Sequence, residues 1–133
     1  MRVAWFETDA SGRIHWSAPF RWAEAAEHAL LRVLIRSEEL FNCFPRRAAN
    51  VVYLAPLTFG DELEVQLMLG SLGHTSITYE WKIIHDGQTA VSGSHTVVHI
   101  NANGRSSPWP DSFREALCRR LEADDEERPP LPD

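Results

Sequence analysis

The chain has 133 residues, of which 44% are hydrophobic and 24% are charged. These proportions fit one globular domain with a single core and leave no room for a second domain. The formal net charge is −6 at pH 7, but six acidic residues and one arginine lie in the last twelve positions. The rest of the chain is nearly neutral, which argues against nucleic-acid binding because phosphate contacts need many lysines and arginines.

The sequence contains no run of eighteen apolar residues, and its N-terminus lacks the residue order of a signal peptide. We therefore expect a cytoplasmic protein that does not interact with membranes. The two cysteines, Cys43 and Cys118, lie far apart without metal-ligand spacing, so reduced thiols are expected.

The predicted elements begin with a short β-prone run, residues 3–8, which ends at the turn-forming residues 9–12. Ser17 is a suitable N-cap for the alanine- and leucine-rich segment that follows, which predicts a helix to about Arg36. Apolar residues occupy most faces of this helix, so we expect other elements to surround it.

Alternating apolar and polar residues in 63–69 and 77–83 predict two half-buried strands. Together with 51–57 and 90–101, they predict four consecutive strands joined by turns. A last helix is expected at about 111–123. The acidic, proline-rich residues 122–133 are predicted to form a disordered tail, so that residues 1–121 make up the domain.

A long apolar helix between one strand and a four-stranded meander is buried only if the sheet curls around it. The predicted fold is therefore α+β, with a long central helix wrapped by a curved antiparallel five-stranded sheet, the hotdog fold. The outer face of the sheet is expected to remain partly apolar. A homodimer that joins two sheets, or a dimer of such dimers, would cover it.

Two segments carry a resemblance to a known family. The segment from Trp5 to Trp16, followed by Phe20 to Glu24, resembles the aspartate-turn-glycine segment that leads into the central helix of the 4-hydroxybenzoyl-CoA thioesterase family. Residues 52–57 and 59–63 resemble a hairpin of that family. The resemblance covers about residues 3–110. It implies hydrolysis of an acyl-CoA or acyl-carrier-protein thioester without a metal or another cofactor.

By position, the resemblance implies that Asp9 is the nucleophile or general base and that the Trp16 N–H polarises the thioester carbonyl. Elementary chemistry agrees, because a helix N-terminus offers unpaired N–H donors to a developing oxyanion. Many relatives have a histidine where Trp16 stands, whereas here His15 lies one position earlier and is a third catalytic candidate. The candidate substrate-binding residues are Gly12, Ser17, Glu24, Tyr53, Phe59 and Ser76.

Simpler explanations exist for some of these residues. Asp9 could bond only the backbone of its own turn, and Glu24 could form a surface pair with His28, for which we expect a supporting role. His95 and His99 would lie roughly 13 Å apart on one strand, too far to share a metal ion.

Other functions and substrates also remain open. A hotdog dehydratase or hydratase is one alternative, with His15 and Asp9 as acid and base, and a non-catalytic acyl-binding protein is another. The turn at 72–75 lacks the basic cluster with which some relatives hold CoA phosphates. CoA would then need other cations such as Arg46, Arg47 or Arg105. The sequence does not choose between an aromatic and an aliphatic acyl group.

Overall fold

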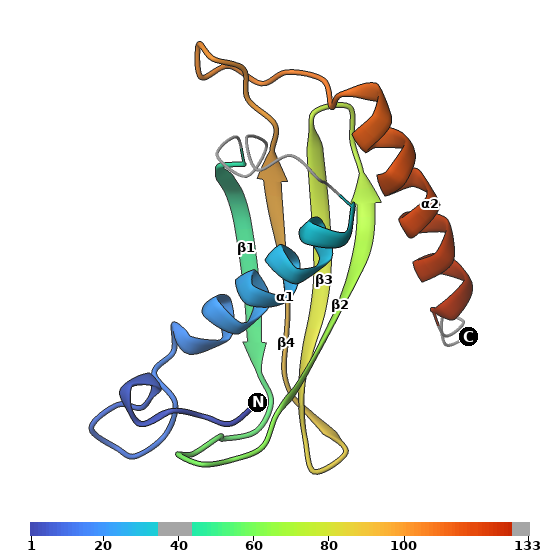
Figure 1. Cartoon of the computed structure of the whole chain (residues 1–133). Helices are drawn as coiled ribbons and strands as arrows, with labels where there is room; N and C mark the ends of the chain where they lie inside the picture. The colour runs from blue at the N-terminus through green and yellow to red at the C-terminus, as the bar shows by residue number, and fades with distance from the viewer. Residues whose placement is uncertain (35–43, 129–133) are drawn as a thin grey trace.

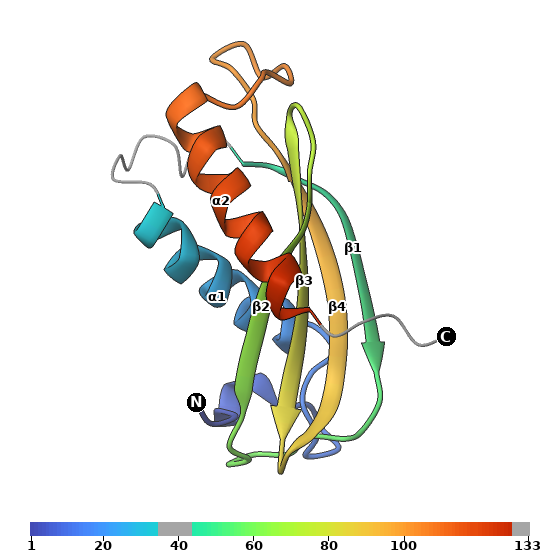
Figure 2. The ribbon, with the colours of Figure 1, turned by 90° about the vertical axis from the view of Figure 1, so that its right-hand side faces the viewer.

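The computed structural model describes residues 1–34 and 44–128. Its elements in chain order are a 3-10 turn η1 (Trp5–Glu7), α1 (Ala18–Leu34), β1 (Arg46–Tyr53), β2 (Glu64–Leu72), β3 (Ser76–His85), β4 (Gln88–Val98) and α2 (Asp111–Glu127). The strands form one antiparallel sheet in the order β1-β4-β3-β2. Helix α1 crosses one face of this twisted sheet, and α2 packs along β2 at its edge (Figures 1 and 2). The predicted hotdog arrangement is therefore present.

The sheet has four strands, so the prediction of five is wrong. Residues 5–7 of the expected first strand form η1 instead. The reason is local, because the Glu7 carboxylate accepts a hydrogen bond from the Ala4 N–H at 2.8 Å and stabilises the turn. The pairing of the N-terminus with the sheet is reduced to a bridge between Arg2 and Glu62 and flanking backbone hydrogen bonds.

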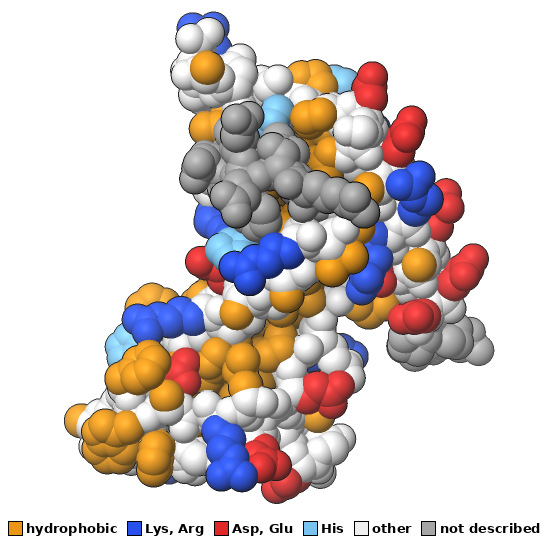
Figure 3. All heavy atoms as spheres, in the orientation of Figure 1, with side chains coloured by type: hydrophobic (Ala, Val, Ile, Leu, Met, Phe, Trp, Pro, Cys, Tyr) orange, Lys and Arg blue, Asp and Glu red, His pale blue; other side chains and the backbone are white. Residues whose placement is uncertain are grey.

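The turn η1 also leaves large apolar side chains in contact with solvent. Trp5 and Phe6 are 70% and 74% exposed, and exposed apolar side chains gather over the N-terminal segment at the lower left of Figure 3. Within the described residues, no helix is long and apolar enough to span a membrane.

Helix α2 continues past the predicted domain boundary at residue 121. Asp124 is 3% exposed, and its carboxylate accepts a hydrogen bond from the Leu69 N–H at 2.8 Å. Arg128 donates to the Leu69 carbonyl at 2.9 Å. Residues 122–127 are helical, not a disordered tail, and Asp124 and Arg128 hold this end of the chain at the β2 edge of the sheet. Residues 129–133, the predicted end of α1 near Arg36, and Cys43 lie outside the described residues.

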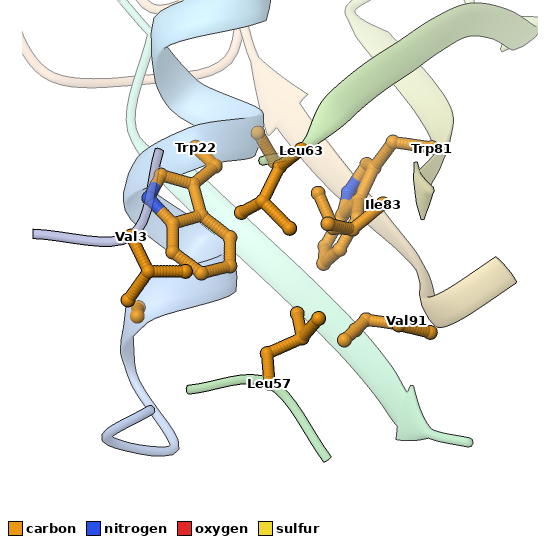
Figure 4. Close-up of a cluster of buried hydrophobic side chains, with 10 residues drawn as sticks. Val3, Trp22, Leu57, Leu63, Trp81, Ile83 and Val91 are labelled. Carbon is orange, nitrogen blue, oxygen red and sulfur yellow. The ribbon is translucent and has the colours of Figure 1, made fainter. Parts of the chain in front are cut away.

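Two clusters of buried apolar side chains lie between α1 and the sheet. In the first, Trp22 of α1 faces side chains from β3, β4 and the loops before β2 (Figure 4). In the second, Leu31 near the end of α1 packs with Tyr79 of β3 and with Phe113 and Leu117 of α2. Burial of this apolar surface is the main favourable term in folding.

A layer of polar side chains is also buried between α1 and the sheet. Glu27 of α1 is 1% exposed, and its Oε2 lies 3.1 Å from Nε2 of His95 and 2.5 Å from Nη1 of Arg46. On the other side of the imidazole ring, Trp81 donates its indole N–H to Nδ1 at 3.1 Å. The Tyr79 hydroxyl is buried without a hydrogen-bond partner in the described part of the chain. These contacts fix α1 over β3 and β4.

The outer face of the sheet is mostly polar, so the expectation of a partly apolar face is wrong for its centre. The side chains that alternate with the buried ones of β3 and β4 are Glu80, Lys82, Ser92 and Ser94. Apolar exposure lies instead on and just after the edge strand β1, where Val52, Tyr53 and Leu54 are 46–59% exposed.

Candidate active site

The turn that carries Asp9 is closed by backbone hydrogen bonds. The Asp9 carbonyl accepts from the Gly12 N–H at 3.1 Å, and the Asp9 N–H donates to the Arg13 carbonyl at 2.8 Å. Gly12 has φ +81°, in the left-handed region that favours glycine. The turn conformation therefore accounts for Gly12, which the sequence proposed as a substrate contact.

The Asp9 side chain is exposed and is bonded on one oxygen. Its Oδ1 accepts hydrogen bonds from the Ser11 hydroxyl at 2.5 Å and from the Ser11 N–H at 2.7 Å. These two bonds, with a smaller contribution from the charge of nearby His15, lower the pKa of Asp9 below its ordinary value. Asp9 is therefore ionised at neutral pH, and its Oδ2 has no hydrogen-bond partner within residues 1–34 and 44–128.

His15 and Ser17 form a pair immediately before α1. Nδ1 of His15 accepts a hydrogen bond from the Ser17 N–H at 3.2 Å and lies 2.7 Å from the Ser17 hydroxyl. Because Nδ1 accepts, the proton of the neutral ring is on Nε2. Because α1 begins at Ala18, Ser17 occupies the predicted N-cap position, but its side chain bonds His15 instead of a helical N–H.

The backbone of Trp16 lies between this pair and the edge strand. Its carbonyl accepts a hydrogen bond from the Tyr53 hydroxyl of β1. Its N–H has no acceptor in the described part of the chain, and Trp16 lies in the turn two residues before α1. The predicted oxyanion donor is thus unpaired, and Tyr53 ties the start of α1 to β1.

Of the remaining candidate site residues, not all lie at the end of the molecule that carries the Asp9 turn. Phe59 packs edge-to-face on Trp5, with ring centroids 5.4 Å apart. Glu24 is exposed on α1, and one of its oxygens lies 3.7 Å from Arg46. Ser76 begins β3 at the hairpin that lies at the other end of the sheet from the start of α1 (Figure 1). Its carbonyl accepts from the indole N–H of Trp109 at 3.3 Å. Within one chain, Ser76 therefore does not contribute to the Asp9 site.

Exposed aromatic side chains lie before and after the Asp9 turn in the chain and on the segments that contact these residues. Trp5, Phe6, Trp16 and Phe59 are each more than half exposed, and Tyr53 is 46% exposed. Exposed apolar groups that gather in this way typically mark a binding site or a protein interface. The sequence left open whether Trp5, Tyr53 and Phe59 are core residues, dimer contacts or part of an acyl pocket, because a hydrophobicity pattern does not reveal which rings lie at the surface.

A cavity of about 220 Å³ adjoins this site, between η1 and the first turn of α1. It is lined by Phe6, Glu7, Thr8, His15, Ser17, Ala18 and Arg21. Glu7 and Arg21 were not identified from the sequence, since nothing in the spacing relates them to His15. A larger cavity of about 910 Å³ lies on the outer face of the sheet beneath α2 and contains none of the predicted site residues.

The other polar residues considered from the sequence have structural partners or lie elsewhere. Arg46 binds Glu27, and His95 belongs to the same buried layer. His99 lies 2.9 Å from the Ser107 carbonyl through its Nδ1. Among the described side chains, no group of three or more metal-binding residues is present.

Comparisons with known proteins agree with the fold. The model of the thioesterase-like superfamily matches residues 3–117. A 1,4-dihydroxy-2-naphthoyl-CoA hydrolase from Prochlorococcus marinus is 26% identical over 113 residues, which cover 76% of this chain and 72% of the relative. The solved structure of a gentisyl-coenzyme A thioesterase is 30% identical, has a TM-score of 0.80, and is matched over 89% of this chain and 97% of its own.

A solved structure from Aquifex aeolicus is 26% identical, with a TM-score of 0.79 and coverage of 88% of this chain and 95% of that one. The chain therefore belongs to the thioesterase-like superfamily of hotdog proteins and is a thioester hydrolase.

Proposed function

We propose that this protein hydrolyses acyl-CoA thioesters, with Asp9 as nucleophile or general base and the Trp16 N–H as oxyanion donor. One observation carries the proposal. An ionised carboxylate with a free oxygen and an unpaired N–H two residues before α1 lie at the two ends of one eight-residue segment. Attack on a thioester needs a group of each kind.

The reaction follows from these groups. In one route the Asp9 carboxylate attacks the thioester carbonyl, the thiolate leaves, and water hydrolyses the acyl-aspartate anhydride. In the other, Asp9 takes a proton from the water that attacks. In both routes the negative oxygen of the tetrahedral intermediate accepts a hydrogen bond from Trp16. In this proposal, the Nε2–H of His15 donates a hydrogen bond to the leaving sulfur.

We propose an aromatic acyl group as the preferred substrate. Two relatives are named for aromatic acyl groups, gentisyl and 1,4-dihydroxy-2-naphthoyl. The exposed rings of Trp5, Trp16, Tyr53 and Phe59 offer flat apolar surfaces for such a group. CoA is the proposed carrier because both relatives are named for CoA esters. A carrier-protein ester is the alternative.

We also propose a homodimer that joins two sheets through β1. Most residues of β1 are exposed. At the other edge, Leu69 of β2 is bonded to Asp124 of α2 and to Arg128, and Leu63, just before β2, is bonded to Met1. An open edge strand is a template for pairing with a second copy. Because Tyr53 of β1 contacts Trp16, such an interface would lie beside the proposed site and complete its pocket.

Edge pairing is tested with two substitutions at one exposed position of β1. The Leu54 N–H bonds β4, so by alternation the N–H of Ala49 points to the open edge. Ala49→Pro removes that donor and is expected to give a monomer by light scattering, while Ala49→Val keeps it and stays dimeric. A dimeric Ala49→Pro variant would place the interface elsewhere, and a tetrameric wild type would indicate a dimer of dimers.

The activity is tested with aromatic and aliphatic acyl-CoA esters, an acyl-carrier-protein ester and an enoyl-CoA hydration assay. Asp9→Asn keeps size and removes charge, so it is expected to lower kcat by roughly 10²-fold or more while the protein stays folded. Equal activity of the variant would shift the role to another carboxylate, with Glu24 as the first alternative. Hydration without hydrolysis would favour a hydratase. Saturable binding without turnover would favour an acyl-binding protein.

A further inference from the structure

Glu7 is a buried acidic residue two positions before Asp9. Its side chain is 9% exposed, and its two carboxyl oxygens have different partners. Oε2 accepts a hydrogen bond from the indole N–H of Trp22 at 2.6 Å, and Oε1 accepts one from the Ala4 N–H at 2.8 Å. No arginine, lysine or histidine forms an ion pair with Glu7 in the described part of the chain. Two uncharged donors therefore hold this group.

These contacts join the two segments that carry the proposed reacting groups. Trp22 lies in α1, is 4% exposed and belongs to the first core cluster, so its indole is fixed by packing. The backbone carbonyl of Glu7 also accepts a hydrogen bond from the His15 N–H at 2.7 Å. Through its side chain and its carbonyl, Glu7 thus binds both the helix and the residue that immediately precedes Trp16.

The geometry points to Glu7 as a positioning residue, which sets the Asp9 segment against the start of α1. We infer that its hydrogen bond to Trp22 holds the Asp9 carboxylate in line with the Trp16 N–H. The inference rests on the proposed role of Asp9 and adds Glu7 as the residue that orients the Asp9 carboxylate. Glu7 touches no reacting atom, so its loss should affect the rate of the chemical step more than substrate binding. Displacement of reacting groups by about 1 Å can cost roughly 10²-fold in rate.

The test is steady-state kinetics of Glu7→Gln on the best thioester of the wild type. The amide keeps the size of the side chain but puts an NH₂ group against either Trp22 or Ala4, so one of the two bonds is lost. We expect kcat to fall by roughly tenfold or more, with KM changed less than about threefold. Thermal melting must show that the variant is folded at the assay temperature.

A control separates positioning from loss of stability. Asp124 is also a buried carboxylate that accepts a backbone N–H, but its partner Leu69 lies in β2. Asp124→Asn is expected to lower the melting temperature while kcat stays within about twofold of wild type. If Glu7→Gln lowers kcat no more than Asp124→Asn does, the positioning role is wrong.

A double-mutant cycle tests the Glu7–Trp22 bond itself. Trp22→Phe removes the indole donor and is expected to lower kcat in the same way. The double variant should be little slower than the slower single variant, because both changes break one interaction. Additive losses would contradict the inference. If Glu7→Gln does not fold, the test of the positioning role rests on Trp22→Phe alone. An unchanged kcat of Trp22→Phe would then overturn the proposal.

The outcomes also distinguish this inference from the proposed function. A wild type without thioester hydrolysis, or an active Asp9→Asn variant, would contradict the proposed function. An active wild type, an inactive Asp9→Asn and a fully active, folded Glu7→Gln would refute only the positioning role.

Discussion

Trp81 and His95 lie on neighbouring strands, and the indole N–H of Trp81 donates to Nδ1 of His95 at 3.1 Å. Because Nδ1 accepts this bond, the proton of the neutral ring is on Nε2, which faces the Glu27 carboxylate at 3.1 Å. Arg46 supplies a second donor to Glu27. The buried Glu27 carboxylate is thus paired through Oε2 with His95 of β4 and Arg46 of β1.

This pairing predicts a large loss of stability on removal of the Glu27 charge. Glu27→Gln keeps the shape of the side chain but leaves Arg46 without its close anionic partner. We expect the free energy of unfolding to fall by about 2–3 kcal/mol, since Arg46 is partly exposed and the full cost of breaking a buried pair is reduced by solvent. Urea denaturation of the variant and the wild type measures the difference.

Glu24 provides a matched control, because it also pairs with Arg46 but is more than half exposed. Glu24→Gln should change the free energy of unfolding by less than about 0.5 kcal/mol. If Glu27→Gln and Glu24→Gln lower the free energy of unfolding equally, burial does not determine how strongly a pair with Arg46 stabilises the protein.

The contribution of Glu27 should also depend on pH. Burial raises the pKa of Glu27, but the bonds and charges of His95 and Arg46 outweigh it, so the net pKa lies below the ordinary value. A lowered folded-state pKa stabilises the protein above the unfolded-state pKa, and this stability is lost as pH falls through the folded-state value. The difference between wild type and Glu27→Gln should therefore be constant near neutral pH and shrink below about pH 4.3. Urea titrations from pH 3 to 7 check this, and a difference that grows on acidification would contradict it.

Ser11 is predicted to control the ionisation of Asp9. Its hydroxyl is the largest cause of the lowered pKa of Asp9, so Ser11→Ala should move that pKa upward, toward the ordinary aspartate value of about 3.9. A carboxyl-carbon NMR titration of both proteins measures the change, and the acid limb of kcat/KM should shift in the same direction. If the Asp9 titration is the same in the two proteins, the Ser11–Asp9 bond does not persist in solution.

Asp124 is predicted to stabilise the attachment of α2 to β2. Asp124→Ala leaves the Leu69 N–H without an acceptor and frees Arg120 from its 3.0 Å contact. The expected loss in the free energy of unfolding is about 1–3 kcal/mol. Asp125→Ala, at the neighbouring exposed position, should cost less than about 0.5 kcal/mol. Thermal and urea denaturation of both variants compare them, and similar values would argue against the edge contact.

The sequence determined the features that depend on local pattern. Alternation in 63–69 and 77–83 predicted β2 and β3, because strands bury every second side chain. The alanine- and leucine-rich run after Ser17 predicted α1, and the Asp9 turn with Gly12 followed from residue types that favour turns. The catalytic assignment of Asp9 and Trp16 came from resemblance and remains a prediction.

The tertiary structure alone decided the features that join distant residues. The bond of Glu27 to His95 spans 68 positions, and that of Leu69 to Asp124 spans 55. Within the first segment, the bonds of the Glu7 carboxyl group to Trp22 and Ala4 hold η1 where alternation alone favoured a strand. A periodic pattern of apolar residues indicates which face of a helix or strand is buried. Which polar groups meet inside is set by the packing of whole elements, because a buried polar group is stable only where another element brings it a partner.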